Sequence, residues 1–403
     1  MTNVSQVLCL ECGYPQDYAL HDHLIHSHAM TVRQYLAQHP DATTVSPRLA
    51  AKIASQVDPT RPRKAVRGSL SINLAGIQFP VDLRVPLSAC LPPPEDYVLP
   101  DTGASKVSVQ HILTSIRKRR TTWVYGPTGS GKDAIIHFVS ALCRIPGLFV
   151  EFRPDSDSSA KIACRSFHNG STVWEEGEVL RAICDGYVIR DADGSVVDRV
   201  PYLILLSDLD RASPDQMEIF RPIIDSISGR VPMPNGKIRT VLRGTQFIAT
   251  ANTVGSGERT VDYVTAQPQD ISMLNRFECF HRLDYPEWNI TAEALRRHFP
   301  DLLGKCPELV DRLGEFVKAL RKENGRVLKT PFSHRDAVAC FNHISDLIEV
   351  AGWTAVTGDK KIIFAGMRSW FHRLPPDAVS IALGIANTHM KDVDVPKTLE
   401  AFP

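Results

Sequence analysis

Short apolar runs alternate with helical stretches between residues 105 and 286. The strand candidates among them are residues 122–125, 148–152, 202–206 and 246–251. Strands separated by helical stretches are typical of a parallel sheet covered by helices on both faces. The pattern therefore predicts an α/β domain over residues 105–286.

The pattern changes on either side of this domain. Residues 69–86 alternate apolar and polar side chains around a glycine, which predicts a β-hairpin, and a proline-rich extended connector completes residues 69–104. Residues 40–68 have the composition of a linker, with a short helix expected at 47–57. Residues 287–403 are expected to form a helical lid domain and a C-terminal tail. Their amphipathic runs lie at 309–321, 335–350 and 367–371.

Composition limits the class of protein. The chain has 403 residues with a formal net charge of +1, so no global field attracts nucleic acid or an anionic membrane. No signal peptide is visible, and no apolar stretch approaches the roughly 20 residues that a spanning helix needs. Seven of the nine cysteines are scattered, mostly in apolar surroundings, as reduced thiols are. We therefore expect a cytoplasmic protein without membrane contact.

A glycine-rich segment follows the first strand and opens the next helical stretch. It reads Gly126-Pro127-Thr128-Gly129-Ser130-Gly131-Lys132-Asp133. Glycines let successive backbone N–H groups turn inward, and the N-terminus of a helix favours a phosphate. In such loops the lysine reaches the β- and γ-phosphates, and the next residue is Ser or Thr, which binds Mg²⁺. The segment predicts a nucleotide site, but Asp133 stands where that hydroxyl belongs.

Polar side chains follow two later strands. Residues 202–206 are followed by Ser207, Asp208 and Asp210, and acids at this position hold Mg²⁺ and polarise the attacking water. Asn252 ends another apolar strand and can orient that water beside the γ-phosphate. Both strand ends are therefore expected to contribute to the nucleotide site.

Two later arginines suit the same chemistry. Arg276 lies in Leu-Asn-Arg-Phe and can be presented to the phosphates of a neighbouring subunit. Arg335 lies in Ser-His-Arg-Asp at the start of a late helix, from which it can reach the nucleotide as part of a lid.

The order of these elements resembles AAA+ ATPases of the MoxR branch, in particular the small, ATPase subunit of aerobic cobaltochelatase. The likeness covers roughly residues 69–372. Further matching segments are residues 75–77, 85–86, 96–98, 177–182, 231–237 and 249–255. The resemblance implies that Lys132 is the phosphate lysine, Asn252 sensor 1, Arg276 the arginine finger and Arg335 sensor 2. It also implies a ring, hexameric in the family, that uses ATP and Mg²⁺.

Two positions depart from the family pattern. Aligned on Asp-Glu-Ile-Asp-Arg-Ala, Ser207 replaces the metal-linked aspartate and Asp208 the catalytic glutamate. Asp133 and Ser207 could have exchanged a hydroxyl and a carboxylate, which preserves the groups that face the metal. The competing interpretation is a site that binds ATP and scarcely hydrolyses it. A second register makes Asp208 the metal-linked acid and Leu209 the glutamate's counterpart, which predicts a nearly inactive enzyme; the first aligns without a gap.

The N-terminal residues 1–39 carry candidate metal ligands. Cys9 and Cys12 lie on a tight turn, and His23 and His28 follow with the spacing Cys-x2-Cys-x10-His-x4-His; His26 is an alternative ligand. The segment resembles Ros/MucR-type Cys2His2 zinc fingers, which implies Zn²⁺ on Cys9, Cys12, His23 and His28. A metal-free helical hairpin and a redox pair are the alternatives.

Together these features predict an ATP-hydrolysing ring motor that remodels or activates a partner protein and is recruited through the finger. The MoxR resemblance implies a client or a partner with a von Willebrand factor A domain. The alternative is a DNA-associated, nucleotide-gated scaffold with little or no ATPase activity. Residues 17–30 carry almost no Lys or Arg, which favours protein contact by the finger over DNA binding.

Overall fold

The computed structural model describes residues 7–12, 15–16, 20, 24, 27–28, 30–39, 42, 70–153, 159–168, 171–224, 229–233, 235–255, 266–323, 332–353 and 362–390. The chain divides into two compact units, Met1–Arg67 and Gly68–Pro403. The helix expected at 47–57 and the candidate ligands His23 and His26 lie outside the described residues.

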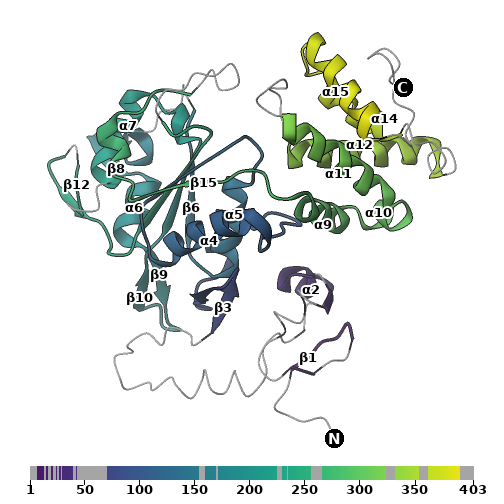
Figure 1. Ribbon diagram of the computed structural model, residues 1–403. Helices are drawn as coiled ribbons and strands as arrows, with labels where there is room; N and C mark the ends of the chain where they lie inside the picture. Colours follow the sequence, from purple (N-terminus) through teal and green to yellow (C-terminus); the bar gives the residue numbers. More distant parts are fainter. Residues whose placement is uncertain are drawn as a thin grey trace, which may run out of the picture. The chain divides into compact units, whose positions relative to one another are not determined.

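A parallel sheet of five strands lies in the second unit, with helices around it (Figure 1). Its order is β15-β5-β14-β11-β6, and every neighbouring pair is parallel. The strands are β5 (Thr122–Tyr125), β6 (Gly147–Glu151), β11 (Leu203–Ser207), β14 (Gln246–Ala251) and β15 (Cys279–Arg282). The predicted α/β fold is therefore confirmed. The predicted strands at 122–125 and 246–251 have their predicted bounds, and the other two are shifted by one residue.

Alternate residues of the sheet enter two separate cores, as the two-residue period of a strand requires. Leu203 and Leu205 of β11 pack with apolar residues of α4 (Gly103–Arg117) and α5 (Lys132–Leu142). Ile204 and Leu206 pack on the opposite face with α6 (Glu178–Asp185) and α7 (Pro214–Ile224). Because both faces are covered, the strand is apolar from Leu203 to Leu206, which is the signal that made it predictable.

Antiparallel hairpins extend from this domain. The predicted hairpin is β3 (Ser71–Leu74) with β4 (Ile77–Pro80), joined at Ala75 and Gly76. Three further pairs were not predicted: β7 (Ala163–His168) with β8 (Ser171–Glu176), β9 (Tyr187–Arg190) with β10 (Val196–Val200), and β12 (Arg230–Pro232) with β13 (Ile238–Thr240). Short 3₁₀ turns lie at Leu87–Ala89, Ser159–Lys161 and Leu209–Arg211, and a one-turn helix, α8, spans Ile271–Leu274.

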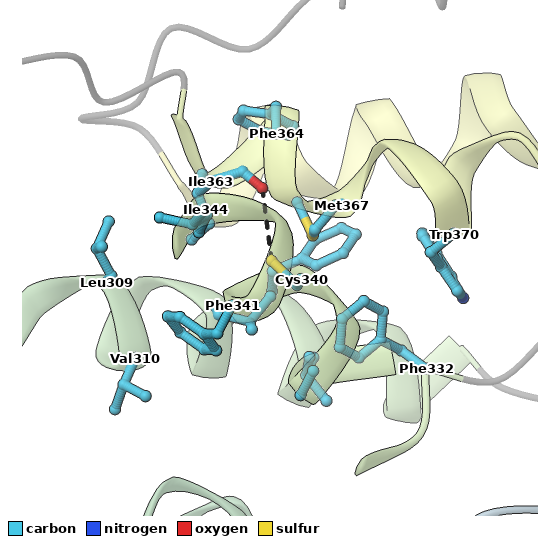
Figure 2. Close-up of a cluster of buried hydrophobic side chains, with 14 of the residues drawn as sticks. Leu309, Val310, Phe332, Cys340, Phe341, Ile344, Ile363, Phe364, Met367 and Trp370 are labelled. Atoms are coloured by element: carbon cyan, nitrogen blue, oxygen red, sulfur yellow. Dashed lines mark hydrogen bonds between the residues drawn. The ribbon is translucent and has the colours of Figure 1, made fainter. Parts of the chain in front are cut away.

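Helices follow the sheet, as predicted beyond residue 286. They are α9 (Trp288–His298), α10 (Pro300–Lys305), α11 (Glu308–Glu323), α12 (His334–Ala351), α14 (Ile362–Phe371) and α15 (Pro376–His389). Their apolar faces enclose a core of their own, part of which is drawn in Figure 2. In it the Cys340 thiol of α12 approaches the Ile363 carbonyl of α14, with Sγ 3.8 Å from the oxygen.

The first unit contains a two-stranded sheet, β1 (Val7–Leu8) with β2 (Pro15–Gln16), and the helix α2 (Val32–Gln38). Thr31 and Gln34 cap this helix reciprocally in a capping box. Tyr35 is fully buried, and its hydroxyl accepts a 2.9 Å hydrogen bond from the Leu10 amide. This bond fastens the turn between Cys9 and Cys12 to the helix. None of the described helices of either unit is both long and apolar enough to cross a bilayer.

Candidate functional site

The glycine-rich loop joins the end of β5 to the start of α5, as its sequence predicts. Gly131 caps α5 in a left-handed conformation, with φ at +90°. Gly129 has φ at +76°, and a Cβ atom placed there would lie 2.7 Å from Cβ of Ser333. Glycine suits both positions because other residues resist positive φ, and at Gly129 the close approach of Ser333 is a second reason. The result is a loop whose backbone leads into the N-terminus of α5.

Lys132 is folded onto this loop and is only 8% exposed. Its Nζ donates to the carbonyls of Gly126 (2.9 Å) and Pro127 (3.0 Å) and to Oδ1 of Asn252 (3.1 Å). The Thr128 hydroxyl donates to the same Asn252 oxygen at 3.2 Å. The predicted phosphate lysine and the predicted sensor amide are therefore in direct contact.

The charges around Lys132 come from the segments that the sequence singled out. Burial lowers the pKa of Lys132; the carboxylates of Asp133, Asp208 and Asp210 oppose this shift, and the Arg335 guanidinium adds to it. Lys132 is therefore influenced by charged groups from three segments: the loop, the end of β11 and the start of α12.

Asp133 meets Ser207, the residue proposed as its exchange partner. The Ser207 hydroxyl donates to Asp133 Oδ2 at 2.8 Å. The Thr250 hydroxyl donates to the other carboxylate oxygen, Oδ1, at 2.5 Å. Ser207 and Thr250 lie on the adjacent parallel strands β11 and β14 and are both buried. One carboxylate and two hydroxyls therefore meet beside the phosphate loop.

Asp208 and Asp210 occupy different surroundings. Asp208 has a left-handed backbone (φ +52°) and is partly exposed, and its carboxylate pairs with Arg211 at 3.3 Å. Asp210 is fully buried, and its Oδ2 accepts bonds from the amides of Asn252 (3.0 Å) and Thr253 (2.9 Å) and from the Thr253 hydroxyl (3.0 Å). Asp210 thus fixes the turn that presents Asn252, and its predicted part in cofactor binding stays a prediction.

The two arginines lie at different ends of the sheet. Arg335 is exposed in the first turn of α12, which begins next to the loop because Ser333 abuts Gly129. Arg276 follows α8, and its carbonyl accepts a 3.0 Å bond from the Thr121 hydroxyl at the amino end of β5. The loop begins at the other end of this strand, roughly 16 Å away at 3.3 Å per residue. Arg276 is therefore remote from its own phosphate loop.

Two residues of the site were not predicted. Thr250 is a polar residue within β14, but threonine is also a common strand former, so the sequence held no distinct signal for it. Tyr285 donates from its hydroxyl to the Thr128 carbonyl at 2.7 Å and so supports the loop. Nothing in its local sequence marks this role, because the contact spans 157 residues.

The donor set fits Mg²⁺ and a nucleotide. Mg²⁺ prefers oxygen ligands and binds through one or two carboxylates together with substrate phosphates. Asp133, Ser207 and Thr250 supply such oxygens beside the loop. Each carboxylate oxygen keeps a second lone pair beyond the one used by its hydroxyl partner.

A second candidate site lies in the first unit. Ligand atoms of Cys9, Cys12 and His28 lie within 4.8 Å of one another. His28 Nε2 is 3.5 Å from Sγ of Cys9 and 3.2 Å from Sγ of Cys12. In a tetrahedral zinc site a sulfur and a nitrogen ligand are about 3.6 Å apart, from the usual bond lengths. The three described candidates therefore have positions that suit a zinc site, and the fourth candidate, His23, lies outside the described residues.

Comparison with known proteins agrees with the first site. Residues 122–267 match the AAA domain family, dynein-related subfamily. An uncharacterized protein of Staphylococcus haemolyticus (strain JCSC1435) is 22% identical over 225 residues, 56% of this chain and 76% of the relative. Another, of Staphylococcus epidermidis (strain ATCC 12228 / FDA PCI 1200), is 22% identical over 171 residues, 42% and 58% respectively. The matched segment contains the loop, Ser207, Asp208 and Asn252, so this part of the chain is similar to AAA domains.

Proposed function

We propose that this protein is an ATP-hydrolysing AAA+ motor of the MoxR type that acts on a partner protein. The observation that carries the proposal is the contact of Asp133 with Ser207, 2.8 Å between Oδ2 and Oγ. It supports a reciprocal exchange, in which the carboxylate has moved from the strand to the loop and the hydroxyl from the loop to the strand.

Each residue has a defined task in this proposal. Lys132 Nζ exchanges its bonds to Gly126, Pro127 and Asn252 for bonds to the β- and γ-phosphates. Asp208 orients the attacking water, for which its partly exposed carboxylate is available. Asp133 with Ser207 would hold Mg²⁺, which neutralises charge on the phosphates when bound.

The proposed motor acts as a ring. Arg276 lies at the end of the sheet opposite its own phosphate loop, so it serves a neighbouring subunit, whereas Arg335 serves its own from the lid. An arginine supplied to a transferring phosphoryl group stabilises the charge of the transition state.

The first unit is proposed to recruit the partner as a zinc module. The positions of Cys9, Cys12 and His28 support Zn²⁺, and zinc binding would supply much of the folding free energy of so small a unit. Zinc measured per chain should be close to one in the wild type and lost in Cys9→Ser; retention of zinc in the variant would contradict this part.

The ATPase rate of the wild type against Lys132→Ala tests the proposal. We expect Mg²⁺-dependent turnover in the wild type and an ATPase rate lower by about 100-fold or more in the variant. Without Lys132 the phosphates are no longer held in the position that reaction requires. A wild-type rate no higher than that of Lys132→Ala would contradict the motor and favour the alternative, a nucleotide-gated scaffold.

A further inference from the structure

Asp133 places a fixed negative charge inside the phosphate loop's own helix. It is the second residue of α5 and lies in the first turn, where backbone amides of a phosphate loop face the nucleotide. Its two oxygens are held by hydroxyls from two strands, Ser207 at 2.8 Å and Thr250 at 2.5 Å. Turning the carboxylate away would leave both buried hydroxyls without a hydrogen-bond acceptor, which costs free energy.

The negative charge of Asp133 affects the binding of a nucleotide. Among the described residues, the carboxylates of Asp133, Asp208 and Asp210 and the guanidinium of Arg335 influence the charge on Lys132. Asp208 is paired with Arg211 at 3.3 Å, whereas the Asp133 carboxylate contacts the neutral hydroxyls of Ser207 and Thr250. The usual Ser or Thr after the lysine is neutral and does not repel a metal-free triphosphate, whereas Asp133 does.

A divalent cation reverses the sign of this interaction. A cation held by Asp133 would be attracted by the carboxylate and by the phosphates, and a carboxylate together with phosphate oxygens is a ligand set that Mg²⁺ prefers. Binding couplings are reciprocal. If the cation raises the affinity for the nucleotide, then the nucleotide raises the affinity for the cation by the same factor.

We propose that Asp133 couples nucleotide binding to a divalent cation, so that this chain takes up Mg·ATP and rejects metal-free ATP. This inference rests on the proposed nucleotide site but not on turnover. It assigns the cation a role at the binding step, and it makes Asp133 the residue that determines which form of the nucleotide is bound.

The test is calorimetric titration of the full chain with ATP, once in excess Mg²⁺ and once in EDTA. The wild type should bind Mg·ATP about 100-fold more tightly than free ATP, near the upper end of typical binding couplings. Asp133→Asn keeps the size of the side chain and an acceptor oxygen but removes the charge, so its ratio should fall below about 10-fold. Asp133→Thr, the ordinary loop residue, should behave in the same way.

Asp215→Asn is the matched control, because Asp215 is an exposed acid of α7 and the change in net charge is identical. Its ratio should equal that of the wild type. Equal wild-type affinities in Mg²⁺ and EDTA, or a ratio unchanged in both Asp133 variants, would overturn the inference and leave the nucleotide site intact. Absence of binding in both conditions would overturn the proposed function and the inference with it.

Discussion

Asp210 shows at the scale of a single residue how a buried charge can order a site. Burial raises the pKa of Asp210, and its hydrogen bonds to Thr253 and Asn252 oppose that shift. The side chain therefore stabilises the domain through the donors that it satisfies. These donors belong to the turn that holds Asn252 against Lys132.

We predict that Asp210→Ala lowers the free energy of unfolding by about 2–3 kcal/mol, because three donors lose a charged acceptor. Asp210→Asn should lose less, since the amide oxygen can still accept these bonds and no charge is buried. Urea denaturation measures both. A variant Asp210→Ala as stable as the wild type would show that the bonds contribute nothing.

Residues of the site were predictable where a motif fixes them. The loop and the end of β11 meet because parallel strands end at one edge of the sheet, so Asp133 and Ser207 could be paired from sequence. Thr250 could not, because threonine inside a strand is also an ordinary β-former. Which of Asp208 and Asp210 turns inward depends on the left-handed backbone at Asp208, which the sequence does not determine.

At the scale of helices and strands, a glycine in a helix tests how closely two helices pack. Gly366 of α14 lies against α12, and a Cβ atom there would be 2.7 Å from Cys340 Sγ and 2.8 Å from Ile344 Cγ1. Cys340 and Ile344 lie close together among the drawn residues of Figure 2. The two helices can approach this closely because position 366 has no side chain.

We predict that Gly366→Ala destabilises the protein by about 1–3 kcal/mol through overpacking. Gly384→Ala is the matched control, since Gly384 lies within α15 with nothing within 4 Å of the added Cβ. It should instead stabilise by about 0.5–1 kcal/mol, the helix propensity gained. Thermal unfolding of both variants measures the difference, and equal effects would contradict the packing described for α12 and α14.

Elements were predictable in proportion to their burial. The fully buried strands β11 and β14 are mostly apolar and were found within one residue. Strand β15 lies at the sheet edge with alternating half-buried and exposed residues, so it lacks that signal and was missed. Helix α14 begins at Ile362, five residues before the predicted run at 367–371, because residues 362–367 are all apolar and buried and so show no amphipathic period.

At the scale of the whole molecule, the chain combines a segment similar to AAA domains, residues 122–267, with a separate N-terminal unit. The family match ends at residue 267, so Arg276 and Arg335 lie beyond it, and their proposed roles rest on their positions in the fold. The two units, Met1–Arg67 and Gly68–Pro403, have separate hydrophobic cores. That separation supports a motor to which a recruiting module has been attached.

The central claim is that Asp133 and Ser207 have exchanged roles in a working ATP site. Its most direct test is the Mg²⁺-dependent ATPase rate of Asp133→Thr, Ser207→Asp and the double variant. Each single change should lower the rate by about 100-fold, because one removes the carboxylate and the other adds a second one. The double variant restores one carboxylate and one hydroxyl in the family's arrangement, and should return to within about threefold of the wild type. A double variant whose loss equals the product of the single losses would contradict the exchange.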